Sequence, residues 1–148
     1  MNETSEVEIL LVEDNQDDLD MTLRALRKAK LANRIEIARD GAEAVEFIFC
    51  QGAHAGRNPE SGPRLILLDL KLPKIDGMEV LKRIKEDPRT KIIPVVVLTS
   101  SKEQKDVIDS YMLGVNSYIV KPVNFDSFLA AVQELGMYWL LLNQAPHS

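Results

Sequence analysis

The stretch Leu65-Ile66-Leu67-Leu68-Asp69 places four consecutive apolar residues directly before an acid. A continuous apolar run of this length is typical of a parallel β-strand that is buried on both faces. Other continuous apolar runs precede and follow it, and we predict them as strands: Ile9–Val12, Val95–Leu98 and Ser117–Val120. A fifth run, Ile35–Ala38, alternates apolar and polar residues, which is typical of a strand at the edge of a sheet.

Helical segments separate the five predicted strands. Three of these segments begin with a candidate N-cap that precedes a glutamate or glutamine by three positions: Asp40, Asp76 and Ser101. Asn15 and Asn124 are candidate N-caps for the first and last helices. The alternation of strands and helices predicts an α/β fold, a doubly wound (βα)5 domain with a parallel sheet.

Length and composition exclude several classes of protein. With 148 residues, 45% of them hydrophobic, the chain can bury one core of ordinary size, and we expect a single domain over residues 1–148. A net charge of −5 argues against nucleic-acid binding, and the single cysteine excludes an internal disulfide. No apolar run approaches the ~20 residues of a membrane span, and because residues 1–6 are acidic where a secretory signal would be basic, we expect no signal peptide. These features predict a cytoplasmic protein.

Polar residues with complementary chemistry follow four of the predicted strands. In chain order they are the acids Glu13 and Asp14, then Asp69, then Thr99 with Ser100, and finally Lys121 with Pro122. The carboxyl ends of parallel strands form the sites of open α/β sheets, so we expect these groups to converge. Each residue alone also fits a structural role, such as a helix cap or a solvated charge. The functional interpretation depends on their coincidence.

The residue types favour one kind of chemistry. Carboxylates that are crowded together repel one another unless a hard cation holds them, and Mg²⁺ prefers oxygen ligands. A lysine in the same cluster can bind a phosphoryl oxygen. An aspartate beside Mg²⁺ can attack phosphorus and form an aspartyl phosphate.

At this point the chain resembles the receiver domains of two-component response regulators, over roughly residues 7–135. Four motifs carry the resemblance: Leu11–Asn15, Leu67–Gly77, Val97–Ser100 and Tyr118–Pro122. The resemblance implies a flavodoxin-like fold with strand order 2-1-3-4-5. It also implies a core over about residues 7–135. From the sequence itself we expect a C-terminal helix that extends to about residue 142, and no output domain.

The resemblance further implies that Asp69 is the phosphoacceptor. Asp14 and Asp69 would bind Mg²⁺ directly, together with the main-chain carbonyl of Lys71. Glu13, where many receivers have an aspartate, would act through a bound water. A phosphoacceptor of this kind is not an enzyme with separate substrate turnover.

The remaining matched residues are implied to form a switch. Lys121 would bind a phosphoryl oxygen, Thr99 would move toward that group, and Ser100 is the small residue that follows. Tyr118 would turn inward as Thr99 vacates space. The Lys121–Pro122 peptide bond is implied to be cis.

Partners follow from the same resemblance. The phosphoryl group would come from a histidine kinase or a phosphotransfer protein, and an unidentified protein partner would recognise the phosphorylated form. The long loop Gln51–Pro63 and the tail around Tyr138-Trp139 resemble the phytochrome-associated branch, which consists of stand-alone regulators served by light-sensing kinases. Two alternatives stay open: a phosphate shuttle or sink in a phosphorelay, and a degenerate receiver that binds partners without phosphorylation.

Enzyme and cofactor-binding families with related features fit less well. A haloacid-dehalogenase-type phosphatase needs a second acid two residues after its nucleophile, where this chain has Lys71. A flavodoxin needs a phosphate-binding loop after the first strand, where Glu13-Asp14 would repel phosphate. A P-loop NTPase needs a Gly-x-x-x-x-Gly-Lys-Ser/Thr motif, which this sequence lacks.

The C-terminal segment carries a separate expectation. Residues 137–142 are apolar on all sides of a helix, and Tyr138, Trp139 and Leu142 are candidate interface residues. We expect a homodimer through this segment, and the alternative is that it folds back on its own domain.

Overall fold

The computed structural model describes residues 9–28, 34–58, 63–122, 124, 126, 127, 129 and 130. Its strands are β1 (Ile9–Val12), β2 (Ile35–Ala38), β3 (Leu65–Leu68), β4 (Val95–Thr99) and β5 (Ser117–Val120). Its α-helices are α1 (Gln16–Lys28), α2 (Gly41–Ile48), α3 (Gly77–Glu86) and α4 (Gln104–Met112), and a 3-10 helix, η2, covers Gly52–His54.

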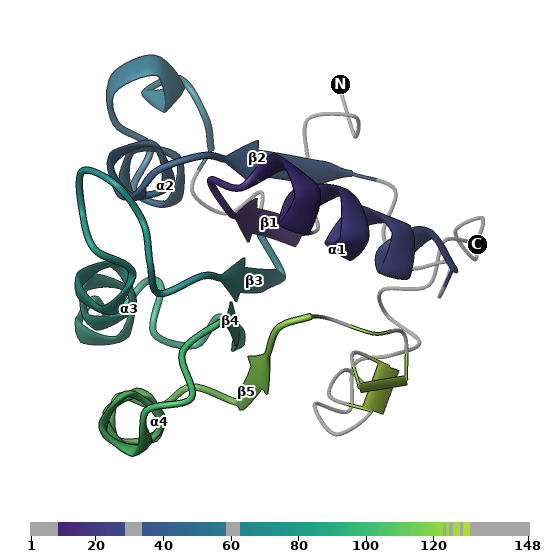
Figure 1. Ribbon diagram of the computed structural model, residues 1–148. Coiled ribbons are helices and arrows are strands. Elements are labelled where there is room, and N and C mark those ends of the chain that lie inside the picture. The colour runs from purple at the N-terminus through teal and green to yellow at the C-terminus, as the bar shows by residue number, and fades with distance from the viewer. Residues whose placement is uncertain are drawn as a thin grey trace, which may run out of the picture.

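The strands form one parallel sheet in the order β2-β1-β3-β4-β5, which confirms the predicted fold (Figure 1). The register aligns Val12 at the end of β1 with Leu68 at the end of β3. Thr99 at the end of β4 is aligned with Val120 of β5. The residues that follow these strands therefore meet at one edge of the sheet.

Alternate residues of the strands pack on opposite faces of the sheet. On one face, Ile9 and Leu11 of β1 belong to a buried cluster with Leu19 and Leu26 of α1. On the other face, Leu10 of β1 packs in a cluster with residues of α2 and α3. Figure 1 shows this three-layer arrangement, with α1 on one side of the sheet and α2, α3 and α4 on the other. Each fully buried leucine contributes roughly 2 kcal/mol to stability.

Four of the five predicted N-caps make the expected hydrogen bonds. Asn15 accepts from the Asp18 N–H, Asp40 from the Glu43 N–H, Asp76 from the Met78 N–H, and Asn124 from the Ser127 N–H. The prediction for Ser101 is wrong, because α4 begins only at Gln104, with Glu103 as its N-cap residue. The Ser101 hydroxyl instead donates to the Asp106 carboxylate at 2.6 Å.

Two strands differ in detail from the prediction. Strand β4 continues to Thr99, one residue beyond the predicted end, and all of its residues are buried. Strand β5 is predicted together with the continuous, buried strands, yet it forms an edge of the sheet, and three of its four residues are only half-buried. Strand β2 forms the opposite edge, as its alternating sequence predicts.

A glycine lets the start of α3 approach the end of β3. The Gly77 N–H donates to the Leu70 carbonyl at 3.0 Å. A Cβ atom at this position would collide with the main-chain oxygen of Asp69 and with the backbone of Leu70. The close approach of α3 to the strand end at Asp69 therefore requires glycine at this position.

Two predictions fall on residues outside those described. They are the extended C-terminal helix with Tyr138, Trp139 and Leu142, and residues 59–62 of the long loop. Among the described helices, every one is too short or too polar to cross a membrane.

Candidate functional site

Three carboxylates gather at the carboxyl edge of the sheet. Glu13 and Asp14 follow β1 directly, and Asp69 follows β3, the strand that pairs with β1. One carboxylate oxygen from each of the three lies within 4.8 Å of the others. Glu13 and Asp69 are buried, with 2% and 4% exposed surface, whereas Asp14 is exposed. The cluster is therefore open to solvent on the side of Asp14.

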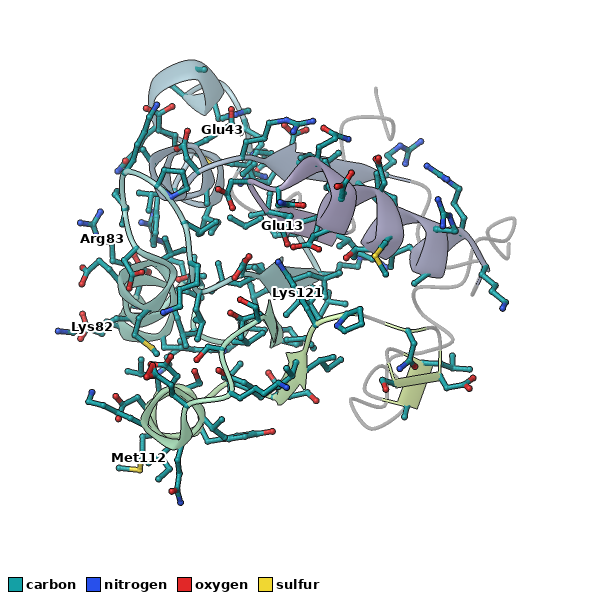
Figure 2. The ribbon with its side chains drawn as sticks, viewed as in Figure 1. Glu13, Glu43, Lys82, Arg83, Met112 and Lys121 are labelled. Atoms are coloured by element: carbon teal, nitrogen blue, oxygen red, sulfur yellow. The ribbon has the colours of Figure 1, made fainter. Side chains whose placement is uncertain are left out.

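Lys121, which follows β5, contacts this cluster with its side-chain ammonium group. Its Nζ atom lies 2.7 Å from Glu13 Oε1, 2.7 Å from Asp69 Oδ2 and 2.8 Å from Asp18 Oδ2. An ammonium group has three N–H donors, so these three carboxylates can use all of them. Figure 2 labels Glu13 and Lys121 on neighbouring parts of this edge. The Lys121–Pro122 peptide bond is cis.

Main-chain donors fix the acids as well. The Lys71 N–H donates to Asp69 Oδ1 at 3.0 Å, while Lys121 holds Asp69 Oδ2. The Asn15 N–H donates to Glu13 Oε2 at 3.2 Å. Both oxygens of Asp69 are therefore oriented before any ligand arrives.

Burial and charge change the acidity of two of these groups. Burial raises the pKa of Glu13 to about 7, and the negative charge of Asp69 adds to this effect. Hydrogen bonds from Lys121 and Asn15 oppose it only in part. Burial alone would lower the pKa of Lys121, but its hydrogen bonds with Asp18, Asp69 and Glu13 raise it above the ordinary value. Lys121 is therefore a permanent cation in this site.

The residues predicted to form a switch lie between β4, β5 and α4. Thr99 is fully buried, and its Oγ1 accepts a hydrogen bond from the Ser101 N–H at 3.3 Å. The Tyr118 hydroxyl donates to the Ser101 carbonyl at 3.0 Å, and burial raises the pKa of this phenol. Ser100 is exposed. The main chain of Ser101 thus joins Thr99 to Tyr118, and its side chain joins both to Asp106 of α4.

Two residues of this arrangement were not predicted. Asp18 lies in the first turn of α1, three residues after the N-cap Asn15 and four after Asp14. That spacing places Asp14 and Asp18 on one side of the helix start, and this is the signal that could have identified Asp18. Ser101 was predicted as a cap, and only the structure places it between Thr99 and Tyr118.

Comparison with known families and curated proteins gives a consistent result. Residues 9–133 match the model of the response regulator receiver domain. The chain is 44% identical to the probable methanogenesis regulatory protein FilR2 of Methanothrix harundinacea, over 93% of this chain and 86% of that protein. It is 45% identical to the response regulator Rcp1 of Synechocystis, over 89% of this chain and 88% of Rcp1.

Solved structures of response regulators resemble the fold of this chain. The bacteriophytochrome response regulator RtBRR is 49% identical and superposes with a TM-score of 0.84, over 95% of this chain and 84% of that one. The Mn²⁺-bound form of Rcp1 is 42% identical with a TM-score of 0.76, over 95% of this chain and 99% of that one. The phosphorylated cyanobacterial phytochrome response regulator RcpA is 42% identical with a TM-score of 0.75, over 91% of this chain and 94% of that one. The fold, the cluster at the strand ends and these matches together show that the chain belongs to the response regulator receiver domain family, the signalling switches of two-component systems.

Proposed function

We propose that this receiver accepts a phosphoryl group on Asp69 and that the phosphorylated form is recognised by a protein partner. The position of the Asp69 carboxylate is the main support for this proposal. Asp69 is buried at the end of β3, within reach of Glu13 and Asp14 on one side and in contact with Lys121 on the other. A carboxylate held between acids and a fixed cation is suited to accept a phosphoryl group when a divalent metal is present.

The donor set fits a hard divalent cation. Carboxylate oxygens are the ligands that Mg²⁺ and Mn²⁺ prefer, and the exposed Asp14 leaves an open side. Asp14, Asp69 and the main-chain carbonyl of Lys71 would bind the ion directly, and Glu13 would act through water. The Mn²⁺-bound form of the relative Rcp1 supports a divalent cation as a ligand of this chain. The bound cation would neutralise the acids and stabilise charge on the transferring phosphoryl group.

The transfer itself is a substitution at phosphorus. A carboxylate oxygen of Asp69 forms the new bond to phosphorus while the bond from phosphorus to a histidine nitrogen of the donor breaks, and the electron pair leaves with that nitrogen. The product is an aspartyl phosphate, whose added oxygens Lys121 would bind. The main-chain N–H of Lys71, which holds Asp69 Oδ1 at 3.0 Å, keeps the acceptor oriented during the step.

We assign Thr99 and Tyr118 to the switch that follows. The phosphoryl group can shift a conformational equilibrium only through contacts that are unique to the active state, and the Thr99 hydroxyl supplies such a contact. Movement of Thr99 would disturb the hydrogen bond from the Ser101 N–H. Because Tyr118 and Asp106 bind the same serine, the change would reach α4 and β5. This connection favours a switch over a simple phosphate shuttle or sink.

The proposal also includes the protein that donates the phosphoryl group and the oligomeric state of this chain. The likeness to bacteriophytochrome and phytochrome response regulators supports a light-sensing histidine kinase as the phosphodonor. Self-association through Tyr138, Trp139 and Leu142 stays a prediction from the sequence.

A labelling experiment tests the function. Incubation of the purified protein with Mg²⁺ and acetyl phosphate should label the wild type and leave Asp69→Asn unlabelled. Chelation of the metal by EDTA should abolish the wild-type labelling. Equal labelling of Asp69→Asn would refute the assignment of the acceptor.

A further inference from the structure

We propose that Asp18 is a positioning residue that holds Lys121 when a divalent cation occupies the acidic cluster. The inference depends on the proposed metal site, and it concerns a residue that the three-carboxylate cluster does not include. Asp18 lies in the first turn of α1, and its Oδ2 is 2.8 Å from Lys121 Nζ.

Lys121 and a bound metal ion are two cations that need the same carboxylates. Lys121 contacts Glu13 and Asp69, and both of these acids belong to the cluster that fits a metal ion. Lys121 and the metal therefore compete for the same negative charge. A metal ion that enters the cluster weakens the attraction of Glu13 and Asp69 for the ammonium group.

The ammonium group of Lys121 lies in a buried environment. The Lys121 side chain is only 9% exposed, so water cannot replace lost carboxylate partners easily. A buried cation beside a divalent ion would be strongly destabilised without a counter-ion of its own. Asp18 is the contacting carboxylate that lies outside the metal cluster, so its interaction with Lys121 becomes more important when metal binds.

Hydrogen bonds hold the main chain of Asp18 in place. Its own N–H donates to the side chain of the N-cap Asn15 at 2.9 Å, and the Asn15 N–H donates to Glu13. The start of α1 is thus tied to the acid pair that ends β1. The Asp18 carboxylate is one-third exposed, so it lies at the solvent-facing side of the Lys121 ammonium group.

A neighbouring residue provides a matched control. Asp17 carries the same charge in the same first turn of α1, is exposed, and is not among the three carboxylates that contact Lys121. Substitution of either aspartate by asparagine removes one charge and the same interaction with the helix dipole. Of these two substitutions, only Asp18→Asn removes a carboxylate that contacts Lys121.

Calorimetric titration with Mg²⁺ tests the proposal without phosphorylation. Asp18→Asn should weaken Mg²⁺ binding about tenfold, a loss typical of a charge-assisted hydrogen bond. Asp17→Asn should change it less than about twofold. Asp18→Glu keeps the charge and should restore most of the affinity. Equal effects of Asp17→Asn and Asp18→Asn would overturn the proposal.

A double mutant separates positioning from direct metal binding. In a Lys121→Ala background, Asp18→Asn should have no larger effect than Asp17→Asn, because there is no lysine to hold. A tenfold loss that persists in this background would show that Asp18 acts on the metal itself and would overturn the positioning role. A wild type that fails to bind Mg²⁺ would instead refute the proposed metal site, so the two failures are distinguishable.

Discussion

Replacing Glu13 by glutamine should stabilise the metal-free protein, and the gain should grow with pH. Glu13 is buried beside Asp69, and burial raises its pKa from 4.5 to about 7. The folded protein therefore binds a proton at Glu13 more tightly than the unfolded chain does. Stability contributed by this group is present at low pH and is lost as the pH rises from about 4.5 to 7.

The size of the effect follows from the two pKa values. A difference between 4.5 and about 7 corresponds to about 3 kcal/mol at a pH above both values. Glutamine has nearly the same shape and carries no charge, so it avoids this loss. We expect Glu13→Gln to be more stable than wild type by about 1 kcal/mol at pH 5.5 and by about 3 kcal/mol at pH 8. The second value corresponds to a rise in Tm of roughly 6–12 °C.

Thermal and urea unfolding in EDTA, at several pH values between 5.5 and 8, measures this difference. Glu86→Gln, which removes an exposed carboxylate at the end of α3, is the control for the loss of one surface charge. A stability difference that stays constant with pH, or a Glu13→Gln variant that is less stable than wild type at pH 8, would refute the reasoning.

Three further predictions concern the metal, the switch and the assembly. Asp14→Asn should abolish Mg²⁺ binding measured by calorimetry, whereas Glu13→Gln should only weaken that binding and flatten its pH dependence. Loss of binding in Glu13→Gln with binding retained in Asp14→Asn would exchange the roles of the two acids. Thr99→Ala should still be phosphorylated but respond poorly, and undiminished partner binding after phosphorylation would contradict the coupling through Thr99. The wild type should sediment as a dimer and Tyr138→Ala/Trp139→Ala as a monomer, since a buried tryptophan contributes roughly 2–4 kcal/mol at an interface. A wild type that stays monomeric at high micromolar concentration would contradict the predicted dimer.

The sheet could be predicted because its central strands are buried on both faces, and only continuous apolar sequences satisfy that environment. Strand β5 shows the limit of this reasoning. Its sequence, Ser-Tyr-Ile-Val, does not alternate apolar and polar residues, and this pattern alone does not distinguish a strand between two neighbours from one at an edge. The order of the strands came from the family resemblance rather than from hydrophobic patterning.

The candidate site was predictable where it lies on strand ends and was missed where it depends on helices and loops. Glu13, Asp69 and Lys121 could be placed at one edge because parallel strands end together. Asp18 reaches Lys121 from the first turn of α1, and its contact depends on the angle at which the helix leaves β1. Ser101 was predicted as a cap because its spacing to Gln104 matches a capping box, yet its hydroxyl binds Asp106 instead. A sequence motif does not reveal such competition between hydrogen-bond partners.

Chemical mapping of the phosphorylated residue tests the central claim most directly. Borohydride reduces an aspartyl phosphate to homoserine, so treatment of the acetyl phosphate-labelled protein followed by peptide mass spectrometry identifies the acceptor. We predict homoserine at position 69 and unmodified aspartate at positions 14 and 18. Homoserine at another position, or none in a wild type that takes up phosphate, would contradict the assignment of Asp69 as the phosphoacceptor.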